Sequence, residues 1–239
     1  MNIKIVSTFS DQYYEKYSKY FVTSLKKYLK DDIEVILYTD SIVINENHIK
    51  SVNLDKSCPE LLEFKKRNHH RIVENFMFDG ITFAHKSYAI AHAGLNSNSD
   101  FLIWLDGDSE LIGEINQNYF LSKLPSNYYT YYFGRPGTYS ETGFIAFDLR
   151  NPNSKTFFTK IKDYYDTDKI YSLSGYTDCH VFDAVRQEME NNNLIKGCNL
   201  TPDKQKNHFN DFFRGYILHL KGSKKTVRKK HLKKAGVII

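Results

Sequence analysis

Cysteine is scarce in this 239-residue chain, and long apolar runs are lacking altogether. The three cysteines, Cys58, Cys179 and Cys198, are odd in number and scattered, and no pair has the spacing of a metal-binding or thioredoxin-like motif. A reduced, cytoplasmic setting is therefore favoured over a secreted one. No run approaches the roughly 18 apolar residues of a membrane span. Asp11 and Glu15 come too early for a signal peptide, so we expect none.

Acidic residues are absent from the C-terminal end. From Lys221 onward there are eight Lys or Arg and no Asp or Glu, whereas the preceding residues carry 25 basic and 28 acidic side chains. The net charge of +5 therefore combines a mildly acidic body with a basic tail. Such a tail is typical of a solvated segment, but it also suits an anionic membrane surface, nucleic acid or a bound diphosphate. We predict one domain over residues 1–225 and a basic tail over 226–239.

Apolar patterning predicts alternating strands and helices. A hydrophobic content of 41% is enough to bury a core, and neither an internal repeat nor a linker is visible. Runs rich in branched and aromatic residues predict strands, and apolar residues spaced by three or four predict amphipathic helices. The expected strands cover residues 3–8, 34–40, 49–53, 101–105, 128–133, 142–149 and 217–220. The expected helices cover residues 13–29, 59–64, 83–93 (ended by Gly94), 157–165 and 179–189.

The central feature is the stretch DFLIWLDGDSE at residues 100–110. Its apolar run reads as a strand buried on both faces of a parallel sheet, and it opens directly onto Asp106, Gly107 and Asp108. Ligands bind at the carboxyl edge of such sheets. Two carboxylates around a glycine can be aimed at one point, where Mg²⁺ or Mn²⁺ is favoured. The alternative is an ordinary acidic turn after a strand.

A second stretch, YILHLKGSKK at residues 216–225, has complementary chemistry. His219 ends an apolar strand, and imidazole nitrogen is an acceptable ligand for Mn²⁺. Gly222 is followed by Lys224, and lysine binds phosphate as a point charge. A lone histidine is more often structural, but together with Asp106 and Asp108 it completes a predicted metal–diphosphate site.

Four stretches in this order carry a family resemblance: FLIWLDGDSE, ETGFIAFDLRNP, YTDCHVFDAV and HLKGSKK. They resemble GT-A-fold glycosyltransferases, with an order similar to that of glycogenin-like and of viral and bacterial nucleotide-sugar transferases. The resemblance spans nearly the whole chain. It implies a single α/β domain of the GT-A, Rossmann-like type, with a mostly parallel central sheet flanked by helices and a small mixed sheet on the acceptor side. It departs from the family at the tail, where lysine and arginine follow in place of an aromatic residue.

The resemblance also implies site residues and an activity. Asp106, Asp108 and His219 would hold Mn²⁺ or Mg²⁺, which bridges the donor diphosphate. The implied donor-binding residues are Thr8, Phe9, Asp40, Lys86, Asp106, Gly107, Asp108, Gly222 and Lys224. The expected reaction is transfer of a hexosyl or deoxyhexosyl group from a nucleoside diphosphate sugar, of UDP type, to a hydroxyl of a glycan or of a lipid-linked or protein-linked acceptor. A metal and lysines would neutralise the charge that develops on the leaving diphosphate.

An inverting transferase also needs a carboxylate base. Asp178 begins a helix after Gly175, and Glu141 precedes a strand on the acceptor side; a helix cap and a solvated loop acid are the respective alternatives. We favour Asp178, because the first turn of a helix is rigid. The sequence does not settle whether transfer is inverting, which we expect, or retaining.

Two other functions compete with this interpretation. A metal-dependent phosphohydrolase or nucleotidyltransferase would use the same Asp-x-Asp, but residues 6–14, VSTFSDQYY, lack the glycine-rich loop of a nucleotidyltransferase. A nucleic-acid or membrane binder would use the basic tail. The acidic body argues against nucleic acid, whereas peripheral membrane contact through the tail stays open.

Overall fold

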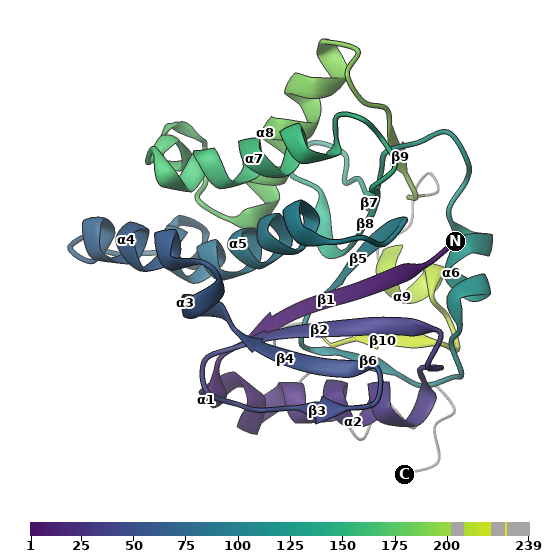
Figure 1. Ribbon diagram of the computed structural model, residues 1–239. Coiled ribbons are helices and arrows are strands. Elements are labelled where there is room, and N and C mark those ends of the chain that lie inside the picture. Colours follow the sequence, from purple (N-terminus) through teal and green to yellow (C-terminus); the bar gives the residue numbers. More distant parts are fainter. Residues whose placement is uncertain (202–207, 221–227, 229–239) are drawn as a thin grey trace.

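A computed structural model describes residues 1–201, 208–220 and 228. Within these residues, eight strands form a mixed, mostly parallel sheet in the order β3-β4-β2-β1-β5-β8-β7-β9, and β6 pairs with β10 in a separate antiparallel ribbon (Figure 1). The strands are β1 (Ile3–Phe9), β2 (Ile33–Thr39), β3 (Asn45–Glu46), β4 (Ile49–Asn53), β5 (Phe101–Leu105), β6 (Ser109–Leu111), β7 (Thr130–Phe133), β8 (Glu141–Asp148), β9 (Gly197–Asn199) and β10 (Ile217–His219).

Helices cover both faces of the sheet (Figure 1). The α-helices are α1 (Asp11–Tyr13), α2 (Lys19–Tyr28), α3 (Leu54–Ser57), α4 (Pro59–Asn68), α5 (Gly80–Asn96), α6 (Gln117–Lys123), α7 (Ser154–Asp166), α8 (Asp178–Asn191) and α9 (His208–Phe212). Shorter turns are the π-helix η1 (Tyr14–Ser18) and the 3₁₀-helices η2 (Phe76–Phe78) and η3 (Lys169–Ser172). Within the described residues, no helix is both long and apolar enough to cross a bilayer.

Two apolar cores lie on opposite faces of the sheet. On one face, Trp104 and other alternate strand residues pack against α4, α5, α7 and α8. On the other face, Ile103 and its counterparts pack against α2, α6 and α9. All five residues of β5 are buried, as its uninterrupted apolar sequence predicts. The predicted α/β class with a mostly parallel sheet is therefore confirmed.

Some predicted details were wrong. Helix α5 does not end at Gly94 but continues to Asn96, and Gly94 faces α7. A Cβ atom at Gly94 would lie 2.3 Å from the ring of Phe158, so glycine is needed there for close helix packing. The predicted helix over residues 13–29 contains the π-helix η1, and strands β3, β6 and β9 were not predicted. The tail 226–239 lies outside the described residues except for Arg228, so its boundary stays a prediction.

Candidate metal and donor site

Three parallel strands bring the predicted donor residues to one edge of the sheet. Phe9 at the end of β1 is in register with Thr39 at the end of β2, and β5 runs parallel on the other side of β1. Asp106 therefore emerges beside the end of β1. The Thr8 hydroxyl donates to the Tyr38 carbonyl at 2.9 Å. This edge is the one at which ligands bind in open α/β sheets.

Gly107 lets the turn after β5 lie directly against β1. A Cβ atom at this position would lie 3.0 Å from Ser18 Oγ, 3.2 Å from the Phe9 ring and 3.2 Å from the Thr8 carbonyl oxygen. The turn is closed by a hydrogen bond from Ser109 N to Asp106 O at 2.9 Å. Close packing of this turn thus brings Thr8 and Phe9 next to the Asp-x-Asp.

His219 lies beside the two aspartates although it is more than 100 residues further along the chain. Strand β10 pairs antiparallel with β6, and this register sets His219 opposite Ser109. Its Nε2 lies 2.9 Å from Asp108 Oδ1 and 3.6 Å from Asp106 Oδ2. Asn210 fixes the backbone of His219, since its Oδ1 accepts from His219 N at 2.7 Å and its Nδ2 donates to His219 O at 3.2 Å. The side chain of His219 is only 2% exposed.

The geometry of these three side chains fits a divalent cation. One ligand atom from each of Asp106, Asp108 and His219 lies within 4.8 Å of the other two. Around an octahedral ion with bonds of about 2.1 Å, neighbouring ligand atoms lie about 3 Å apart. Two carboxylates and one imidazole are donors that suit Mn²⁺ or Mg²⁺.

The two oxygens of Asp106 have different partners. Oδ1 accepts from the indole Nε1 of Trp104 at 2.7 Å and from Lys86 Nζ at 2.8 Å, whereas Oδ2 faces His219. Trp104 precedes Asp106 by two residues, and alternate residues of a strand share a face. The pair Trp104 and Lys86 therefore orients the carboxylate with Oδ2 toward the candidate cation position.

Lys86 lies on α5 and joins the candidate metal group to the first residue of α8. Its Nζ also donates to the Thr142 carbonyl at 2.6 Å and lies 2.9 Å from Asp178 Oδ2. Burial alone would lower the pKa of Lys86, but attraction to Asp106 and Asp178 outweighs it and raises the pKa above its ordinary value. Lys86 is therefore a fixed cation at neutral pH.

Asp178 is not the cap of α8, so this alternative was wrong. The N-cap is Thr177, and Asp178 is the first helical residue. Its Oδ2 also accepts from Thr142 Oγ1 at 2.6 Å, and its side chain is 7% exposed. The adjacent Cys179 is close to the same hydroxyl, and burial together with the Asp178 charge raises the pKa of its thiol to about 12. Cys179 is thus neutral and unreactive.

Glu141 is not a solvated loop acid either. It is the first residue of β8 with a side chain 12% exposed, and its Oε1 accepts from Gly143 N at 3.0 Å. A Cβ atom at Gly143 would lie 2.9 Å from Glu141 Oε1 and 2.7 Å from His219 Nδ1. Glu141 and His219 are therefore neighbours across Gly143, and glycine is required between them.

The remaining predicted residues are less close to this group or lie outside the described part of the chain. Asp40 is exposed after β2, and its carbonyl accepts from Asn53 Nδ2. Gly222 and Lys224 lie outside the described residues. Sequence reasoning missed Trp104 and Thr142. The two-residue spacing of Trp104 and Asp106 was a visible signal, whereas nothing in the sequence indicated the contact between Thr142 and Lys86.

The fold is similar to that of solved glycosyltransferases, although no family model and no curated protein matches the sequence. GlyE of Streptococcus pneumoniae TIGR4 superposes with a TM-score of 0.59 and 11% identity, covering 100% of this chain and 61% of that one. The apo form of GlyE superposes with a TM-score of 0.54 and 12% identity, covering 93% of this chain and 55% of that one. The bifunctional glycosyltransferase WbbM superposes with a TM-score of 0.52 and 12% identity, covering 93% of this chain and 46% of that one. The chain thus spans about half the length of these proteins. It has their GT-A-like fold.

Proposed function

We propose that this protein is a metal-dependent glycosyltransferase that uses a nucleoside diphosphate sugar. The observation that carries the proposal is the convergence of Asp106, Asp108 and His219 at the carboxyl edge of a GT-A-like sheet. In such a site, Mn²⁺ or Mg²⁺ would supply positive charge to the leaving diphosphate. The donor is of UDP type, and the transferred group is a hexose or deoxyhexose.

The chain's own residues would perform the other tasks. Asp106 and Asp108 would anchor the diphosphate end of the donor through the cation, with Lys224 as a further phosphate ligand. Thr8, Phe9 and Asp40 would line the nucleoside pocket at the ends of β1 and β2. Lys86 would keep Asp106 oriented and present a fixed positive charge to the donor, because both of its carboxylate partners hold it in place.

The acceptor would approach from the side of β8 and α8. Its nucleophile is a hydroxyl of a glycan or of a lipid-linked or protein-linked acceptor. For inverting transfer, Asp178 or Glu141 would accept the hydroxyl proton, and general-base catalysis contributes about 10²–10⁴-fold.

A thermal-shift panel tests this proposal. The melting temperature is measured with a series of nucleoside diphosphates and nucleotide sugars, each with Mn²⁺ and each with EDTA. We expect stabilisation only in the presence of metal and only with the matching base, because binding to the folded state raises its stability. Stabilisation that is equal for all bases, or unchanged by EDTA, would contradict the proposed donor site.

A further inference from the structure

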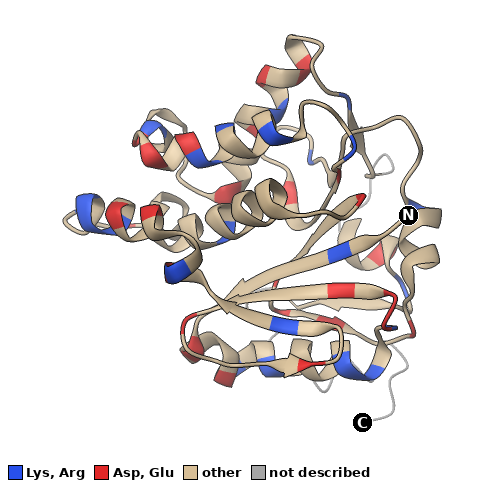
Figure 2. Ribbon diagram, in the orientation of Figure 1, with Lys and Arg blue, Asp and Glu red and all other residues tan. Residues whose placement is uncertain are grey.

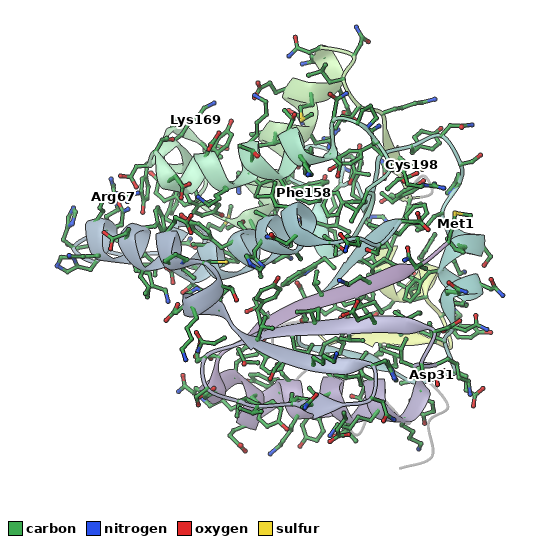
Figure 3. All side chains as sticks on the ribbon, in the orientation of Figure 1. Met1, Asp31, Arg67, Phe158, Lys169 and Cys198 are labelled. Atoms are coloured by element: carbon green, nitrogen blue, oxygen red, sulfur yellow. The ribbon has the colours of Figure 1, made fainter. Side chains whose placement is uncertain are left out.

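The segment that follows β1 packs against the Asp-x-Asp turn. It consists of α1 and the π-helix η1, and it continues directly into α2 (Figure 1). A Cβ atom at Gly107 would lie 3.0 Å from Ser18 Oγ, so the last residue of η1 lies against the turn between the two aspartates. Figure 3 shows side chains that fill the space between α2 and the sheet, where the apolar residues of α2 are buried. This packing holds α1 and η1 next to the candidate metal site.

Tyr13 of this segment contacts one of the candidate metal ligands. Its hydroxyl donates to Asp108 Oδ2 at 3.3 Å, whereas Asp108 Oδ1 lies 2.9 Å from His219 Nε2. The arrangement is similar to that at Asp106, where Oδ1 accepts from the Trp104 indole and Oδ2 faces His219. Each of the two carboxylates therefore has one oxygen toward the histidine and the other on a hydrogen-bond donor.

The backbone and the ring of Tyr13 are both held in place. Ser10 caps α1, because its Oγ accepts from Tyr13 N at 3.1 Å. The Tyr13 ring packs against the Tyr17 ring with centroids 4.9 Å apart. The turn that carries Tyr17 is a π-helix, in which Lys19 N donates to Tyr14 O. Such wide turns are rare and often occur at functional sites, so this one favours a functional role for the segment.

A phosphate site is the alternative role for a helix that begins at the end of β1. Backbone N–H groups at helix N-termini bind phosphates. In Figure 2, however, acidic residues colour the start of this segment. One of them, Asp11, accepts hydrogen bonds from the Ser41 hydroxyl and from the N–H groups of Ser41 and Ile42, which hold the pKa of its carboxyl below the ordinary value. Asp11 is therefore ionised at neutral pH and would repel a phosphate, so the segment is better suited to a cation site.

We propose that Tyr13 is a positioning residue of the metal site, and that its hydroxyl orients the Asp108 carboxylate toward the cation position. This inference rests on the proposed function, because it needs a cation held by Asp106, Asp108 and His219. Hydrogen bonds to a ligating carboxylate orient it before the metal binds. Tyr13 acts on Asp108 and does not contact the cation itself.

Binding of Mn²⁺ to the full chain tests the proposal. Free Mn²⁺ is measured by electron paramagnetic resonance as protein is added, without and with uridine diphosphate, so the readout does not depend on turnover. We expect Tyr13→Phe to bind Mn²⁺ about tenfold more weakly, which is the lower end of the usual effect because the hydrogen bond is long. Tyr14→Phe is the matched control, since it removes a hydroxyl from the next residue, whose ring stacks on Phe9. Its affinity for Mn²⁺ alone should equal that of the wild type.

The melting temperature separates positioning from a structural role. Both variants keep the aromatic ring, so we expect melting temperatures without metal to equal that of the wild type. Weaker Mn²⁺ binding together with a lowered melting temperature would overturn the inference in favour of a structural role for Tyr13. Equal Mn²⁺ affinity of Tyr13→Phe and the wild type would also overturn it, and would leave the proposed metal site intact. If the wild type bound no Mn²⁺ in either titration, the proposed metal site itself would fail, and this inference with it.

Discussion

The Asp106 carboxylate shows how neighbouring side chains define a candidate metal ligand. Trp104 and Lys86 both donate to Oδ1, so two hydrogen bonds occupy this oxygen, whereas Oδ2 faces His219. Hydrogen bonds to a ligating carboxylate orient it, and their loss commonly lowers metal affinity 10–100-fold. In the proposed site, Trp104 would therefore position Asp106 without contacting the cation itself.

Trp104 allows an isosteric test because it is the chain's single tryptophan. Biosynthetic replacement of tryptophan by benzothienylalanine changes only this position, and it exchanges the indole N–H for sulfur at nearly constant volume. We expect Mn²⁺ to bind about tenfold more weakly by calorimetry, with little change in melting temperature. Tyr131→Phe is the control, since its hydroxyl bonds the Pro125 carbonyl away from the site. Unchanged Mn²⁺ affinity after the replacement would show that the N–H does not orient Asp106.

Asp108 has a simpler role in the proposed site, because it contributes one of the two carboxylates. Asp108→Asn should abolish turnover and remove the Mn²⁺-dependent stabilisation by nucleoside diphosphate, while far-UV circular dichroism shows an intact fold. Asp100→Asn is a suitable control, since Asp100 lies before β5 at the opposite end of the strand. Near-normal activity of Asp108→Asn with Mn²⁺ would rule out the metal assignment.

At the level of elements, Gly94 sets the distance between α5 and α7. Gly94→Ala should lower the free energy of unfolding by about 2 kcal/mol, because the added methyl group overlaps the Phe158 ring. Gly80→Ala is the matched control in the same helix. Its Cβ would meet neighbours no closer than 3.4 Å, so the variant should be neutral or slightly more stable. Denaturant unfolding measures both, and a Gly94→Ala protein as stable as the wild type would refute the packing argument.

Helix α8 and strand β8 present the two candidate bases. Asp178→Asn should reduce transfer by about 10²–10⁴-fold while donor binding is kept, and Glu141→Gln should lose less. The pairing of Asp178 with Lys86 offers a different explanation of any loss, so Mn²⁺ affinity must be measured in parallel. A loss of metal and donor binding that matches the loss of transfer would make Asp178 a support for Lys86. Retained anomeric configuration, read by proton NMR, would remove the need for either base.

For the whole molecule, the sequence predicted the parts of the site that depend on single strands. Residues 100–110 alone indicated a buried strand that ends at two carboxylates, and both the α/β class and this strand are confirmed. Contacts that depend on tertiary packing could not be predicted from the sequence. The link from Lys86 to Asp178 requires α5 and α8 to meet at β8. The sequence indicates a helix end at Gly94, because the partner that explains this glycine, Phe158 on α7, is 64 residues away.

One described residue from the basic end of the chain, Arg228, also lies near the candidate site. Arg228 lies against Glu110 of β6, and its guanidinium covers the Tyr20 ring with its carbon atom 3.9 Å from the ring centroid. Glu110 is two residues beyond Asp108, so Arg228 lies in the neighbourhood of the candidate cation position. No sequence pattern predicts this pairing, because the two residues are 118 positions apart in the chain.

The central claim is glycosyl transfer, and the nucleotide product tests it most directly. The nucleotide sugar that stabilises the protein most is incubated with the protein and Mn²⁺, with water as the acceptor, and the products are identified by ³¹P NMR. Glycosyl transfer breaks the bond between the anomeric carbon and the diphosphate, so we expect a nucleoside diphosphate as the product. No product should form in EDTA or with the Asp108→Asn variant. A nucleoside monophosphate together with a sugar 1-phosphate would instead show cleavage within the diphosphate, as in a phosphohydrolase, and would contradict the account.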